Sequence, residues 1–282
     1  MMGKDRYENI KIPEQLASVI YNAQKSASAR KRSLRTMRFA SLIAACIMLL
    51  FTVNIPSVSH AMSKIPVVGK IVQVLQFGGG GERTDGARVG TEAAENTLKI
   101  HFSSGNEPVA NVPSYTVEQK GAPNRLIFTF NGTRQFDYET IEKDLHTLPL
   151  VKDVYRNIIL DDSAMRFVVE LKDGVKHSIS EFKDPGYLEL KLTPNGESAP
   201  PHEVFSIRTG EMLLGEEMGI LEELYPDEDI SFIKTATGNF IAVIGEYDTV
   251  EEAKNKLKEI TEHEFYNGEF YVDSWMSNES PK

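Results

Sequence analysis

The stretch "GNFIAVIGEYDTVEEAKNKL", residues 238–257, decides how the C-terminal part of the chain folds. An apolar run ends at Gly245, an acidic turn follows, and the spacing of the next apolar residues is helical. Asp248 or Thr249 can cap that helix, and acids in its first turn with lysines after them suit its dipole. No side chain in the stretch is an obvious catalyst, so it predicts a strand followed by a helix rather than a reaction centre. The helix side expected to be buried consists of Val250, Ala253, Leu257 and Ile260.

The segments around this stretch extend it to a domain over residues 203–275. Strand patterns alternate with two helical ones, in the order β-α-β-β-α-β. This order predicts a four-stranded, ferredoxin-like sheet with both helices on one face. The strands are expected at 203–210, 229–236, 239–247 and 268–275, and the helices at 211–226 and 248–263.

The second half of this domain resembles the SPOR domain, a module that binds glycan strands of bacterial peptidoglycan. The residues that carry the resemblance are Gly245, Tyr247, Glu251, Glu252, Ala253 and Leu257. The resemblance implies peptidoglycan as a partner. The first strand departs from the family pattern, with Ser206 where Gln is usual and Arg208 where Gly is usual.

The sheet face that the helices leave uncovered is the candidate binding surface. Phe240, Ala242 and Ile244 are expected to face the helices, which puts Ile241 and Val243 on the other side. Exposed β-branched residues in mid-sheet suit the apolar C–H faces of sugar rings, although packing on another domain would explain them too. The predicted glycan-binding residues are Ser206, Arg208, Lys234, Ile241, Val243 and Tyr271.

Residues 97–194 predict a β-rich domain with one helix. "RLIFTF" (125–130), "MRFVVELKDG" (165–174) and "YLELKL" (187–192) read as strands, and "DYETIEKDLHTLP" (137–149) reads as a helix. These strands resemble the AMIN-type β-domains of envelope proteins. Residues 63–96 are expected to be a juxtamembrane segment and a glycine-rich linker, and 195–202 a second linker.

The N-terminal region differs sharply from the rest in charge. Residues 1–38 carry nine Lys/Arg and three Asp/Glu, a net charge of +6. Since the whole chain has a net charge of −10, the remaining residues sum to about −16. Residues 39–55 carry no charge and as a helix would span roughly 25 Å. The flanking charges predict an anchor over 39–62, with the N-terminus cytoplasmic and the C-terminus extracytoplasmic in the cell membrane. A leader cleaved after Ala61 is the rival interpretation.

The basic arm contains one amphipathic segment. Leu16, Ile20 and Ala23 recur at helical spacing, either to lie on membrane lipid or to dock on a cytoplasmic partner. With the later "SHAMSKIPVVGKIVQVLQF", this arm resembles membrane-anchored anti-sigma-factor-type proteins of Gram-positive bacteria. That resemblance implies a sigma factor as a possible partner of residues 8–28.

Sequence alone therefore predicts an α+β, single-pass membrane protein with a β-rich middle domain, a SPOR-like domain over 203–275 and a tail over 276–282. Six scattered histidines and one cysteine, Cys46, give no metal or nucleophile motif, so no enzyme, metal or cofactor is expected. The acidic body argues against nucleic acid. The leading hypothesis is peptidoglycan binding. The alternatives are an anti-sigma factor or envelope-stress regulator, and a protein–protein scaffold of an envelope assembly.

Overall fold

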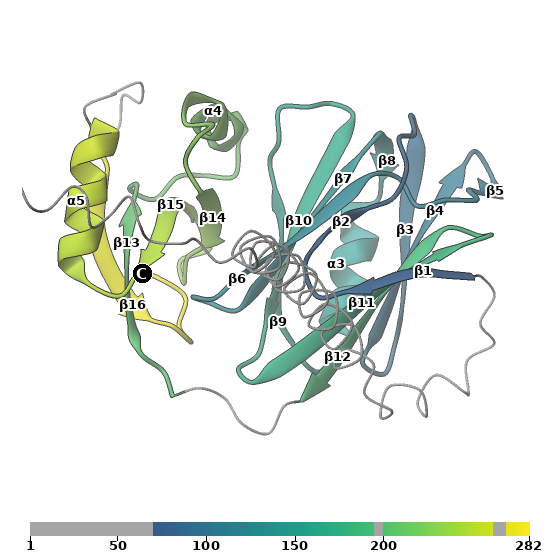
Figure 1. The fold of residues 1–282 in the computed structure, drawn as a ribbon, viewed down its shortest axis with the longest axis horizontal. Helices are drawn as coiled ribbons and strands as arrows, with labels where there is room; N and C mark the ends of the chain where they lie inside the picture. The colour runs from purple at the N-terminus through teal and green to yellow at the C-terminus, as the bar shows by residue number, and fades with distance from the viewer. Residues whose placement is uncertain (1–69, 195–199, 262–268) are drawn as a thin grey trace, which may run out of the picture. The chain divides into compact units, whose positions relative to one another are not determined.

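A computed structural model describes residues 70–194, 200–261 and 269–282, which belong to one compact unit, Val67–Lys282. The first twelve strands are β1 (Lys70–Leu75), β2 (Gly78–Gly80), β3 (Ala87–Ala94), β4 (Thr97–Ser104), β5 (Glu107–Pro108), β6 (Tyr115–Lys120), β7 (Arg125–Asn131), β8 (Thr133–Phe136), β9 (Val151–Asn157), β10 (Ala164–Leu171), β11 (Val175–Lys183) and β12 (Tyr187–Pro194). Helix α3 (Tyr138–His146) lies between β8 and β9 (Figure 1). The last elements are β13 (Glu203–Arg208), α4 (Glu216–Leu224), β14 (Ile230–Lys234), β15 (Phe240–Tyr247), α5 (Val250–Thr261) and β16 (Tyr271–Met276).

Strands β1–β12 form a sandwich of two sheets. A seven-stranded sheet has the order β1-β11-β12-β4-β3-β8 with β5 beside β4, and a five-stranded sheet has the order β2-β6-β7-β10-β9. Their inner faces share one core, to which β4, β12, β7 and β10 contribute alternate residues. The central residues of that core are Leu98, Ile100, Leu188, Leu190, Phe128, Phe130 and Phe167.

Helix α3 closes one side of the sandwich. Asp137 caps it by accepting a hydrogen bond from the Thr140 amide at 3.2 Å, and Ile141 and Leu145 are buried in the sandwich core. The helix contacts β3 and β9. The expected helix and its buried side are therefore confirmed.

Residues 70–80 close another side of the sandwich, because they form an edge strand of the seven-stranded sheet and then an edge strand of the five-stranded sheet. β1 pairs with β11, and β2 pairs with β6. The Gln73 amide donates to Tyr115 Oη at 3.1 Å and to the buried Glu181 carboxylate at 2.6 Å, which ties the two sheets together. The prediction of a juxtamembrane segment and linker over 63–96 is wrong for these residues, because long-range pairing makes the glycine-rich stretch a strand.

The C-terminal elements occur in the expected order, and their sheet has the order β14-β15-β13-β16. Thr249 caps α5, accepting from the Glu252 amide at 3.3 Å, and Ala253 and Ile260 are buried. Helix α4 is shorter than predicted because it begins only after Gly215. Phe240, Ala242 and Ile244 belong to the core that includes residues of both helices, as expected.

The C-terminal sheet contacts the outer face of the five-stranded sheet through the free edge of β14. The carbonyl oxygen of Phe232 on that edge accepts from Arg125 Nη1 at 3.2 Å and from the Tyr155 hydroxyl at 3.3 Å. Ile127 and Val168 on the outer face join the C-terminal core. β7 and β10 are therefore covered on both faces, which explains their nearly continuous apolar sequences.

The expected α+β, single-pass class is wrong for the part of the chain that the structure describes. Strand residues far outnumber helical ones there, since the sandwich contains one short helix and the C-terminal sheet two. Among residues 70–194, 200–261 and 269–282, no helix is both long and apolar enough to cross a membrane. The segment 39–62, on which the anchor prediction depended, lies outside the described residues.

Candidate functional site

The candidate site is the face of the four-stranded sheet opposite α4 and α5. The register pairs Arg208 with both Val243 and Tyr271, and Ser206 and Ile241 lie on the same side. Five of the six residues predicted from sequence are thus brought together. Lys234 is not, because it pairs with Phe240 on the helix side and binds Asp153 at 3.0 Å.

This face is covered, contrary to the expectation of an open one. Ile241 is 0% and Val243 3% exposed, and both cluster with Ile233 and Trp275. Tyr271, at the sheet edge, is 37% exposed. The alternative weighed from sequence, that the face packs on another domain, agrees with the contact made by the sandwich turn between β6 and β7. The segment after β16 adds a second cover from the same sheet.

The first cover is the turn between β6 and β7. Trp275 Nε1 donates to the Ala122 carbonyl at 3.2 Å. Glu246 Oε1 accepts from the amides of Gly121 and Ala122 at 3.2 and 3.1 Å. The turn is therefore held against the sheet by one indole and one carboxylate, with the buried Arg125 3.9 Å from Glu246.

The second cover is the segment after β16. The amide of Ala236 donates to the Pro281 carbonyl at 3.2 Å, and Arg208 Nη1 donates to the Lys282 carbonyl at 2.8 Å. Ala236 follows β14 and Arg208 ends β13, so the segment crosses β15, which lies between them. Ile241 and Val243 lie on that strand.

Arg208 has its charge matched within the site. Its guanidinium lies 3.0 Å from Asp273 Oδ2 and 5.2 Å from the centre of the Tyr271 ring. The side chain is 6% exposed, so these partners compensate for the loss of hydration. A ligand could reach the outer side of Tyr271 without disturbing this pair.

Beneath the first cover, between the β6–β7 turn and the sheet face, lies a cavity of about 290 Å³. Its size is at the lower end of the range of about 300–1,000 Å³ that small-molecule sites occupy. Both sheets and their connections line it: Gln119, Lys120, Gly121, Ala122, Ser206, Asp229, Ser231, Val243, Gly245, Glu246 and Trp275. The lining offers hydroxyl groups, an indole and charged side chains.

The backbone at Gly245 shapes one wall of the cavity. Its φ of +69° is in the left-handed region, and a Cβ there would approach the Tyr247 hydroxyl oxygen to 2.5 Å. The carbonyl oxygen of Gly245 accepts a hydrogen bond from the Ser206 hydroxyl at 2.7 Å. Burial raises the pKa of Tyr247, which keeps its phenol neutral. Gly245 and Tyr247, singled out from sequence, thus set local geometry.

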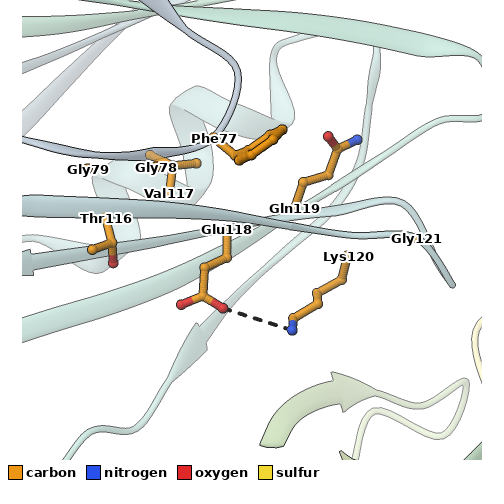
Figure 2. Close-up of a pocket in the computed structure, with 9 residues that line it drawn as sticks. All are labelled: Phe77, Gly78, Gly79, Thr116, Val117, Glu118, Gln119, Lys120 and Gly121. Atoms are coloured by element: carbon orange, nitrogen blue, oxygen red, sulfur yellow. Dashed lines mark ion pairs between the residues drawn. The ribbon is translucent and has the colours of Figure 1, made fainter. Parts of the chain in front are cut away.

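A wider groove of about 730 Å³ adjoins the cavity and shares Gln119, Lys120 and Gly121 with it. Figure 2 shows Phe77 and the glycines of β2 above β6, with Glu118 and Lys120 pointing toward one another. Phe77 is 66% exposed. The groove offers an apolar ring and one ion pair, whereas the cavity has two buried hydroxyl groups, Ser206 and Ser231, on the wall formed by the four-stranded sheet.

Sequence reasoning missed Trp275, Lys120, Asp229 and Glu246. Trp275 is the sole tryptophan of the chain and could have been noticed for that reason. The other three belong to turns and strand ends whose meeting depends on how the sandwich and the C-terminal sheet pack. The predicted partner-binding residues Leu16, Ile20 and Ala23 lie outside the described residues. Within the described ranges, no group of three or more His, Cys, Asp or Glu could hold a metal ion.

Comparison with known proteins bears on one of the resemblances. A stretch of 75 residues is 39% identical to the anti-sigma-V factor RsiV of Bacillus subtilis (strain 168), covering 26% of this chain and 26% of that protein. The chain thus spans about a quarter of the length of the curated relative it matches. No family model matches the chain, so neither the SPOR nor the AMIN resemblance gains support, and no solved structure matches it. Over about a quarter of its length, this chain is similar to an anti-sigma factor.

Proposed function

We propose that the chain is a non-enzymatic, anti-sigma-factor-type regulator, in which residues 8–28 bind a sigma factor. The observation that supports this is the 39% identity to anti-sigma-V factor RsiV over 75 residues. In the proposal, Leu16, Ile20 and Ala23 form the apolar side of a helix that docks in a groove of the partner. Residues 70–282 then serve as a ligand-binding module that regulates this contact.

The test is co-purification of the full chain with a sigma factor of its host. Replacing Leu16→Asp together with Ile20→Asp puts charges into the apolar side and should weaken binding at least tenfold, since each buried aliphatic side chain contributes about 1.5–3 kcal/mol. Ser18→Asp, on the opposite side of the same helical spacing, is the matched control and should bind as wild type does. Equal binding by all three forms would contradict the proposal.

A second candidate function is binding of peptidoglycan glycan strands by the cavity. It is favoured by the meeting of Ser206, Ser231 and Trp275, which offers hydroxyl groups and an aromatic edge as sugar ligands require. Residues 203–275 carry 18 Asp/Glu and five Lys/Arg, a net of −13, which disfavours anionic wall polymers and leaves an uncharged glycan compatible. This function requires the module to lie outside the cytoplasm.

Retention of the full chain on purified peptidoglycan sacculi at physiological salt tests this candidate. Ser231→Leu fills the cavity and should reduce retention about tenfold, because a sugar can no longer enter. Ser231→Ala keeps the space and should reduce retention less than the leucine variant does, by about twofold to fivefold, because it removes only one neutral hydrogen bond. Absence of retention for the wild type, or equal retention of the leucine variant, would count against glycan binding.

A further inference from the structure

The face of the four-stranded sheet is larger than the cavity that remains open on it. The cavity reaches Ser206 and Val243 but not Ile241 or Arg208, and Arg208 donates to the Lys282 carbonyl of the segment that crosses β15. An extended polymer needs a groove along the sheet, and a single, partly open cavity of about 290 Å³ does not offer that. What covers the rest of the face therefore decides whether such a ligand can bind.

The covering segment is attached at few points. Three hydrogen bonds hold its backbone to the sheet: the Ala236 amide donates to the Pro281 carbonyl, Arg208 Nη1 donates to the Lys282 carbonyl, and the Glu279 amide donates to the Met276 carbonyl at the end of β16. Ser280 Oγ lies 3.4 Å from Glu170 and 3.5 Å from Lys152 Nζ, both on the sandwich. Pro281 is buried, while Glu279 and Lys282 are exposed. These contacts are local to the segment, so it can leave without breaking a strand pair of the sheet.

The residues beneath the segment would not tolerate permanent exposure. Ile233 and Ile241 are both 0% exposed and pack together with Val243 and Trp275. Removal of the segment would present them to water, which is unfavourable unless a ligand replaces it. The pyranose C–H faces of a glycan strand offer an apolar surface of the required kind, and Arg208 would be free to donate to its hydroxyls instead of to the Lys282 carbonyl.

We propose that residues 279–282 are a displaceable latch, which closes the sheet face until a glycan strand takes their place. This inference rests on the proposed glycan binding and adds its regulation: the same face exchanges an internal occupant for an external one. Because the latch and the ligand exclude each other, the measured affinity is reduced by the fraction of molecules in the closed state.

Retention of the full chain on sacculi tests the latch with two variants. Deletion of residues 279–282 should raise the affinity about tenfold, the gain expected when a mostly closed state is removed. The second variant, Ala236→Cys with Pro281→Cys and Cys46→Ala, joins backbones that already lie 3.2 Å apart from N to O. Its oxidised form should lose retention and its reduced form should regain it. The Cys46→Ala chain alone is the control, and its retention should not respond to oxidation.

Far-UV circular dichroism and Trp275 fluorescence check that each variant folds. If the deletion variant does not fold, the oxidised and reduced forms of the double-cysteine chain still provide the test, because they have the same sequence. Equal retention of the wild type and of both redox forms would overturn the latch and leave glycan binding standing. Absence of retention for every form, the reduced one included, would overturn glycan binding and the latch with it.

Discussion

Gly80 lies on the edge where residues 70–80 join the two sheets of the sandwich, and its surroundings leave no space for a larger side chain. A Cβ there would overlap the Gln73 amide nitrogen and the Glu181 carboxylate, and would lie 2.9 Å from Tyr115 Oη. Gly80→Ala should therefore break the polar contacts that join β1, β6 and β11, and lower the free energy of unfolding by about 1–3 kcal/mol. Urea denaturation measures this. Gly210→Ala, where nothing lies within 4 Å, should be close to neutral.

His177 makes the stability of the same edge depend on pH. Burial lowers the pKa of His177, and its Nε2 lies 2.7 Å from the Gln76 carbonyl. Since the unfolded chain holds this proton more tightly, stability is full above pH 6.5 and declines as the pH falls below that value. The urea midpoint should drop between pH 7.5 and pH 5.5. His177→Gln, which does not titrate, should show a smaller drop; an unchanged drop would assign it to other groups.

At the scale of elements, sequence pattern succeeded where burial follows from local periodicity. α3 and α5 each have a polar side and an apolar side, and the structure buries the predicted residues Ile141, Leu145, Ala253 and Ile260. It failed for β1 and β2. "KIVQVL" fits a helix side as well as a strand, and "GGG" indicates a break unless a distant partner is known. The prediction that Ile241 is exposed also failed, because the residues that cover the sheet face, 121–122 and 279–282, are distant from it in sequence.

The free edge of β14 is satisfied by side chains of the sandwich, which makes Arg125 the critical residue of that contact. Arg125→Met removes the donor to Phe232 and leaves Glu246 without its cation, so we expect a loss of about 2–4 kcal/mol in the free energy of unfolding. Arg134→Met, at an exposed pair with Asp85, is the matched control and should cost less than about 1 kcal/mol. Similar losses in both variants would contradict the assigned role.

The Tyr155 hydroxyl donates to the same carbonyl oxygen, and burial raises its pKa to about 12. Its phenol consequently stays protonated and able to donate throughout the physiological range. Tyr155→Phe should cost about 0.5–1.5 kcal/mol, less than Arg125→Met, because one neutral hydrogen bond is lost while the ring contact with Phe240 remains. A loss as large as that of Arg125→Met would place the ring, not the hydroxyl, at the centre of the contact.

On the scale of the whole molecule, the sandwich and the C-terminal sheet have separate cores that meet across one surface. Ile127, Tyr155 and Val168 of the sandwich belong to the C-terminal core, which couples the two parts. Far-UV circular dichroism at about 216 nm reports on the strands, most of which belong to the sandwich, and fluorescence reports on the only tryptophan, Trp275, whose indole donates to the Ala122 carbonyl. Circular dichroism therefore follows mainly the unfolding of the sandwich, and fluorescence follows the C-terminal sheet where it contacts the sandwich.

If that coupling exceeds the difference in stability between the two parts, the described unit should unfold in urea in one transition with coincident midpoints by both probes. In Arg125→Met the C-terminal sheet loses its main anchor, so the fluorescence midpoint should move to lower urea than the circular dichroism midpoint. Arg134→Met should keep the midpoints together. Separate midpoints in the wild type would mean that the two parts fold independently, and the latch would then act within the C-terminal part alone.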